Sequence, residues 1–127
     1  MVRVACLLIG YVCGLFQTAY IYGRINGIDI REHGSGNSGT TNALRVLGMK
    51  AGLIVFAGDI LKILAAGFLV TVLFNQGDFF GDRAALYKLY AGLGAVLGHN
   101  FPFYLNFKGG KGIAVTSGLI LMMDWRI

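Results

Sequence analysis

The fold is decided by residues 51–74, which read AGLIVFAGDILKILAAGFLVTVLF. This run is long and apolar enough to cross a hydrocarbon core of roughly 30 Å as one helix. Asp59 and Lys62 interrupt it, and their spacing places both side chains on one face of a helix. A charge inside a bilayer is costly unless it is paired, so the two are predicted to neutralise one another. Two roles for the pair remain open: a polar wall near a substrate, or an ion pair that only fixes helix packing.

Further apolar runs cover residues 4–22, 84–98 and 113–123. The first carries no charge and is predicted to span as one segment. A signal peptide is the alternative, but the run exceeds a usual signal core and ends in Tyr-Ile-Tyr where small residues should precede cleavage. The second is also predicted to span, whereas the last is half-length, re-entrant or truncated. The prediction is an all-α, polytopic membrane helix bundle with about three full spans and a short fourth helix.

Composition supports a membrane protein. Of the 127 residues 56% are hydrophobic and 13% are charged, which is more apolar and less charged than ordinary soluble domains. A net charge of +5 would suggest nucleic acid in a soluble protein. Here the positive residues collect in loops beside apolar runs, which favours an anionic leaflet or a phosphorylated substrate. We therefore expect membrane lipid as a partner and no nucleic acid.

The charges of the connections predict an orientation. Connection 23–50 holds more basic than acidic residues, whereas connection 75–83 holds two aspartates and one arginine. By the positive-inside rule the first connection is cytoplasmic, the second is external and the N-terminus lies outside. Two predicted spans separate connection 23–50 from connection 99–112, so these two glycine-rich loops are predicted to share the cytoplasmic face.

The glycines within the runs are predicted to serve helix packing. Gly10 and Gly14 are four residues apart, and so are Gly94 and Gly98. This small-xxx-small spacing permits the backbones of two helices to approach closely.

The first glycine-rich loop reads HGSGNSGTTNALR at residues 33–45. Glycine recurs at every second or third position with hydroxyl or amide side chains between, so several N–H groups can turn inward. Thr40 or Thr41 is predicted to cap a helix whose N-terminus meets an anion. Arg45, about one turn further on, is predicted to hold two phosphate oxygens at once. The alternative is a flexible polar turn between two spans.

The second loop reads GHNFPFYLNFKGGKG at residues 98–112. Lys108 and Lys111 flank a glycine pair, which offers two ammonium groups and a close backbone approach to one anion. Neither loop has the Walker pattern, so nucleotide hydrolysis is not supported. The aromatic residues between 101 and 107 form either an interfacial anchor or the lining of an acyl groove. His99 is either a hydrogen-bonded residue at a helix end or a catalyst.

The two loops closely resemble the motifs of the bacterial acyl-phosphate-dependent glycerol-3-phosphate acyltransferase family, PlsY. The resemblance covers almost the whole chain, and two long motifs at the family's separation are far more specific than any one glycine pattern. The matching segments are GIDIREHGSGN at 27–37, Thr41-Asn42, Arg45, Gly48, Asp59 with Lys62, GHNFP at 98–102 and FKGGKG at 107–112.

The resemblance implies an enzyme of the bacterial cell (inner) membrane that moves an acyl group from acyl phosphate to glycerol 3-phosphate. The products are lysophosphatidate, a phospholipid precursor, and phosphate, and neither a cofactor nor a metal is implied. Family members resemble a single domain of seven helices with an outside N-terminus. Residues 1–127 resemble the N-terminal part of that domain and end before a third cytoplasmic motif, so activity of this chain alone is not implied.

The resemblance also implies site residues. By position, Ser35 and Arg45 belong to the catalytic polar set. The substrate-binding residues are Gly36, Asn37, Thr41, Asn42, His99, Lys108, Gly109, Gly110, Lys111 and Gly112. Because both substrates carry phosphate, such a site needs mainly to position them and offset charge, without an enzyme nucleophile. Ser35 as an acyl carrier is the weaker alternative, since no base lies near it in sequence.

Other classes of membrane protein share some of these features. Glycine-broken segments with charges in mid-membrane also mark transporters, so part of a transporter for a phosphorylated metabolite is an alternative. A non-catalytic membrane subunit is a third. Formation of lysophosphatidate in detergent would separate the enzyme from both alternatives.

Overall fold

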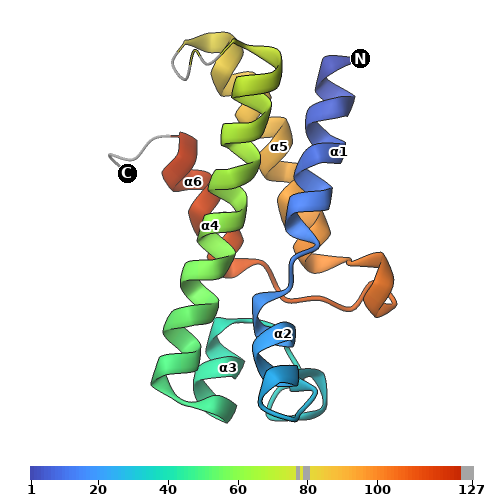
Figure 1. The fold of residues 1–127 in the computed structure, drawn as a ribbon, viewed down its shortest axis with the longest axis vertical. Helices are drawn as coiled ribbons and strands as arrows, with labels where there is room; N and C mark the ends of the chain where they lie inside the picture. Colours follow the sequence, from blue (N-terminus) through green and yellow to red (C-terminus); the bar gives the residue numbers. More distant parts are fainter. Residues whose placement is uncertain (77, 79–80, 124–127) are drawn as a thin grey trace.

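A computed structural model describes residues 1–76, 78 and 81–123, and the regular secondary structure in this part of the chain is all helical, without strands. Helices α1, α4, α5 and α6 form a bundle, and α2 and α3 lie beside the N-terminal half of α4, which extends past the other three (Figure 1). The N-terminus, the end of α4 and the start of α5 lie at the opposite end (Figure 1). The elements are α1 (Val2–Gly14), α2 (Thr18–Ile25), η1 (Ile30–Glu32), α3 (Thr40–Leu47), α4 (Met49–Phe74), α5 (Asp82–Asn100), η2 (Phe103–Leu105) and α6 (Ile113–Met123).

Helix α4 is the longest element described and confirms the predicted span at 51–74. Its face toward the bundle buries small and branched residues, among them Val55, Ile63 and Val70. Its other face leaves large apolar side chains such as Leu61 and Phe68 more than half exposed. Apolar contacts with lipid suit that outer face far better than contacts with water.

The predicted span over residues 4–22 is present, but it is built from two helices. Helix α1 ends at Gly14, α2 begins at Thr18, and Gln17 between them has extended backbone. The segment Val2–Ile25 is still long and apolar enough to cross a membrane. The break contains neither glycine nor proline. Its cause is tertiary, because the side chain of Gln17 and the carbonyl of Phe16 bond to other helices.

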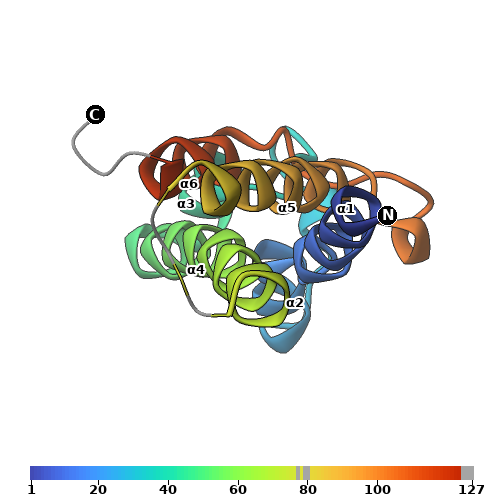
Figure 2. The same cartoon turned by 90° about the horizontal axis from the view of Figure 1, so that it is seen from above.

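Helices α1 and α5 pack backbone against backbone, which confirms the predicted role of their glycine pairs (Figure 2). A Cβ atom on Gly10 would overlap the backbone of Ala91, and one on Gly94 would overlap the carbonyl of Leu7. Gly14 and Gly98 are enclosed in the same way. Small residues are therefore required on both helices.

The other two predicted runs also form helices. Helix α5 extends beyond the predicted 84–98 at both ends, and its 19 residues reach roughly 28 Å at 1.5 Å per residue. It is not among the two segments in the described residues that meet both the length and the apolarity expected of a span. Helix α6 is short, as predicted, with 11 residues. Residues 77, 79 and 80 of the predicted external connection, and 124–127, lie outside the described residues.

Gly94→Ala is predicted to destabilise the bundle by about 1–3 kcal/mol, because the new methyl group would press on the backbone of α1. Gly23→Ala in α2 is the matched control, since a Cβ there meets its neighbours at 3.4 Å or more. Equilibrium unfolding in mixed detergent micelles, followed by circular dichroism, measures both. Equal stabilities for the two variants would contradict backbone contact between α1 and α5.

Candidate functional site

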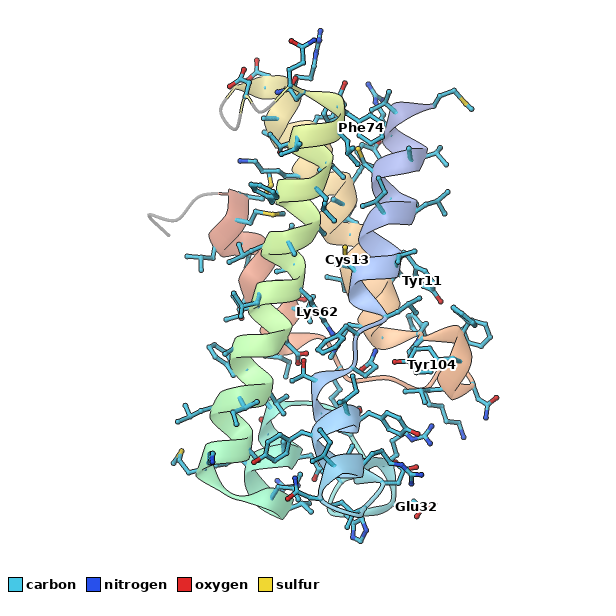
Figure 3. All side chains as sticks on the ribbon, viewed as in Figure 1. Tyr11, Cys13, Glu32, Lys62, Phe74 and Tyr104 are labelled. Carbon is cyan, nitrogen blue, oxygen red and sulfur yellow. The ribbon has the colours of Figure 1, made fainter. Side chains whose placement is uncertain are left out.

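The site is built around the ammonium group of Lys62, which lies on α4 at the level of the break between α1 and α2 (Figure 3). Its Nζ donates to the carbonyl of Phe16 at 2.8 Å and lies 2.7 Å from Nδ1 of His99. It also forms the predicted ion pair with Asp59, at 3.2 Å from Oδ1. Lys62 is 6% exposed, Asp59 1% and His99 2%, so the cluster is shielded from solvent.

The break between α1 and α2 is tied to the end of α5. The amide of Gln17 donates to the carbonyls of Gly98 and His99, at 3.3 and 2.9 Å. Two tyrosine hydroxyls cross the same junction: Tyr11 donates to the carbonyl of Phe101, and Tyr104 donates to that of Leu15. The segment that follows α5 is therefore held against the N-terminal segment.

The glycine pair of the second loop lies on the last turn of α5. The N–H of Gly109 donates to the carbonyl of Asn100 at 3.0 Å, and that of Gly110 donates to His99 at 3.2 Å. A Cβ on Gly109 would overlap the carbonyl of His99, and one on Gly110 would overlap its imidazole and approach the carbonyl of Ser38. Glycine is thus required where the two loops meet.

Asn42 holds the first loop in shape. Its buried amide donates to the carbonyls of His33 and Asn37 at 3.0 Å each, and its Oδ1 accepts from the N–H of Ser35 at 3.0 Å. The hydroxyl of Ser35 in turn accepts from the N–H of Asn37 at 3.3 Å. Gly34 and Gly36 supply the positive φ angles of 56° and 77° that this turn requires.

Helix α3 begins without a side-chain cap, so the predicted capping by Thr40 or Thr41 is wrong. The helix begins at Thr40 itself, and the N-cap is Gly39. Thr40 therefore lies in the first helical turn, and its buried hydroxyl oxygen has no hydrogen-bond partner among the described residues. The first N–H groups of a helix have no partner inside it, so the uncapped turn retains free donors.

A cavity of about 160 Å³ lies where the two loops meet. The first turns of α3 and α6 both border it, each with its N–H groups and the positive end of its helix dipole. The buried cluster contributes Asp59 and His99 to its wall. The remaining lining residues are Asn37, Gly39, Thr40, Thr41, Phe56, Lys111, Gly112, Ile113 and Ala114.

A second hollow of about 290 Å³ lies beside η1 and is lined by Asp29, Arg31, Glu32, Gly36, Asn106, Lys108 and Gly109. Its cation Arg31 forms two hydrogen bonds to Asp29, at 2.7 and 3.0 Å, and lies 5.0 Å from the ring centre of Tyr20. The hydrogen bonds from Arg31 lower the pKa of Asp29 to about 2. Within this hollow Arg31 is therefore already neutralised, which leaves Lys108 as the cation that can meet an anion.

The predicted site residues fall into three groups. Asn37, Thr41, His99, Lys111 and Gly112 line the first cavity. Gly36, Lys108 and Gly109 line the second hollow. Those that line neither are Ser35 and Arg45, which are exposed, and Asn42 and Gly110, which are buried.

Sequence reasoning missed two parts of the cluster. Gln17 lies inside an apolar run of the sequence, and an amide side chain in a charge-free span is a signal of polar packing. The contact between Lys62 and His99 joins residues 37 positions apart, and no spacing rule predicts it. Within the described ranges no set of three His, Cys, Asp or Glu side chains could hold a metal ion.

Comparisons with known proteins agree on one family. A family profile described as glycerol-3-phosphate acyltransferase matches residues 4–127. The glycerol-3-phosphate acyltransferase of Bacillus subtilis is 47% identical over 116 residues, which cover 91% of this chain and 55% of that protein. That of Alkaliphilus metalliredigens is 45% identical over 123 residues, which cover 96% and 58%. The chain thus spans little more than half the length of these curated relatives.

A solved structure has the same fold. The crystal structure of PlsY (YgiH), an integral membrane glycerol 3-phosphate acyltransferase, in its glycerol 3-phosphate form superposes with a TM-score of 0.80 at 31% identity. The match covers 98% of this chain and 58% of that chain. The lysophosphatidic acid form gives a TM-score of 0.77 at 30% identity. The chain is an integral membrane protein and belongs to the glycerol-3-phosphate acyltransferase family.

Proposed function

We propose that this chain carries the phosphate-binding part of a membrane enzyme that transfers an acyl group from acyl phosphate to glycerol 3-phosphate, releasing phosphate and lysophosphatidate. One observation carries the proposal: the first turns of α3 and α6, one from each glycine-rich loop, border the same cavity together with Lys111 and His99. Glycerol 3-phosphate is the acceptor in the description of the family to which the chain belongs, and acyl phosphate is the donor that the resemblance of the two motifs implies.

The electrostatics of the cavity support an anionic ligand. Two helix N-termini each add a partial positive charge and free N–H donors, and the ammonium of Lys111 adds a full charge. The carboxylate of Asp59 opposes them, but Lys62 lies 3.2 Å away and neutralises it. A phosphate group is the anion that uses several such donors at once.

The chemistry then needs positioning and charge stabilisation more than an enzyme nucleophile. An acyl phosphate is an activated acyl donor, so a hydroxyl of glycerol 3-phosphate can attack its carbonyl carbon as the carbon–oxygen bond to phosphate breaks, and the proton of that hydroxyl leaves with the released phosphate. Donors fixed around the departing phosphate stabilise the charge that develops on it. We propose that the cavity holds the phosphate of glycerol 3-phosphate, whereas Ser35 and Arg45, which lie outside the cavity, contact the departing phosphate of the acyl donor at its exposed side.

Substrate access and orientation follow from the same arrangement. We propose that the end with α2, α3 and the two loops faces the cytoplasm of a bacterial inner membrane, with the N-terminus outside, because this end carries the denser positive charge. Since the relatives are longer than this chain, we expect full turnover to need a protein of their length.

Lys111→Met is predicted to weaken the binding of glycerol 3-phosphate about tenfold or more, because a charge-assisted hydrogen bond contributes roughly 1.5–3 kcal/mol. Lys50→Met is the matched control, since Lys50 is also an exposed lysine but does not line the cavity. Isothermal titration in detergent micelles measures both variants. Equal losses would indicate a general charge effect, and no loss in Lys111→Met would contradict the phosphate site.

The orientation is testable by cysteine labelling in intact cells, in a background with Cys6 and Cys13 replaced by Ala. A single cysteine at Gln76 is predicted to react with an impermeant thiol reagent, whereas one at Glu32 is predicted to react only after the cells are opened. Both positions are exposed, so burial does not decide the result. The reverse pattern of labelling would invert the proposed topology.

A further inference from the structure

The surroundings of Lys62 determine where His99 carries its proton. A lysine ammonium has three N–H donors and no acceptor. Here it meets the carbonyl oxygen of Phe16, Nδ1 of His99 and the carboxylate of Asp59. At 2.7 Å from an ammonium, Nδ1 must accept, because a proton on that nitrogen would point at another donor. Neutral imidazole then has its proton on Nε2.

The other ring nitrogen is directed at the glycine loop. A Cβ on Gly110 would overlap Nε2 of His99, so this nitrogen lies directly beside the backbone of the loop. The imidazole lines the same cavity as Lys111. The ring nitrogen that contacts Lys62 is Nδ1, so Nε2 faces the glycine loop and the cavity, where its N–H can meet a ligand.

We propose that Lys62 is a positioning residue that fixes His99 in the Nε2–H tautomer, and that this N–H donates to a phosphate oxygen held at the glycine loop. The second half of this proposal rests on the proposed function, whereas the first does not. Lys62 does not line the cavity, so it acts through His99. The Nε2–H of His99 is a neutral donor that already points into the site before the ligand binds. Less conformational entropy is then lost when the ligand binds.

The tautomer can be observed directly in the 127-residue chain. The chain has two histidines, so His33→Gln leaves His99 as the one imidazole in a nitrogen-15 NMR spectrum. The expected result at neutral pH is an unprotonated Nδ1 that accepts a hydrogen bond and a protonated Nε2. A proton on Nδ1, a mixture of tautomers or a doubly protonated ring would overturn the assignment.

The same spectrum tests the role of Lys62. The double variant Asp59→Asn/Lys62→Met removes both charges of the buried pair. It should therefore destabilise the fold less than a single replacement, which would leave one charge unpaired in the bundle. The expected result is a mixture of the two tautomers, with circular dichroism confirming native helix content. A retained Nε2–H tautomer in the folded double variant would remove Lys62 from this role.

The donor function is tested by two replacements of His99. Gln can place an N–H near the position of Nε2, whereas Asn reaches only the position of Nδ1 and loses the donor to the cavity. With glycerol 3-phosphate and inorganic phosphate as probes in calorimetric titration, His99→Gln should stay within about threefold of the native affinity. His99→Asn should weaken binding about tenfold or more.

If His99→Asn weakens the binding of inorganic phosphate as well as that of glycerol 3-phosphate, the contact with His99 is at the phosphate group. Equal affinities of the two variants, whether both intact or both lost, would overturn the donor function. If the native chain bound neither probe, the proposed function and the donor function would both fail for this chain. The tautomer assignment would still be decided by the spectrum.

Discussion

The rest of the structure depends on one buried cation. The ammonium of Lys62 lies between three segments and meets a different acceptor on each: a carbonyl freed by the break after α1, a carboxylate on α4, and an imidazole at the end of α5. In an apolar bundle such a charge is tolerated only when these partners are in place. Because Lys62 needs the carbonyl of Phe16 as a partner, α1 has to end near the position of Lys62 along α4. Because it also needs His99, α5 has to turn the face that carries His99 toward α4.

The functional geometry follows from that junction. Because the end of α5 is fixed, the glycine pair at residues 109 and 110 can lie on the carbonyls of His99 and Asn100. That contact directs the start of α6 toward the start of α3, whose loop is held separately by Asn42. Two helix N-termini then share one cavity with a lysine and a histidine. The contacts of Lys62 thereby position the residues that form the anion site.

The sequence predicted those features that depend on local spacing. The Asp59–Lys62 pair and the two glycine pairs follow from helical periodicity, and the long apolar runs follow from bilayer thickness. The break at residues 15–17 could not be predicted, because nothing in Leu-Phe-Gln opposes a helix and its cause lies on α4 and α5. The predicted cap of α3 is wrong because either threonine is a good cap by residue type, whereas the helix begins at Thr40 with Gly39 as its N-cap.

The candidate site was predicted as two loops on one face, and the structure divides its residues differently. Thr41, His99 and Lys111 meet at one cavity, Lys108 lies at another, and Arg45 lies at neither. Sequence patterns indicate which residues suit phosphate, but they contain no information on which of them share one phosphate. That information comes from contacts far apart in sequence.

The central claim is that both loops hold one phosphate group. Its most direct test is dipolar recoupling between phosphorus-31 and nitrogen-15 in the membrane-embedded chain saturated with glycerol 3-phosphate. The chain would be labelled at Thr41 on the first loop and at His99 and Lys111 on the second. If one phosphate is shared, all three residues lie at short phosphorus–nitrogen distances from the same phosphorus atom. A phosphorus atom close to the labels of one loop alone, or to none of them, would contradict it.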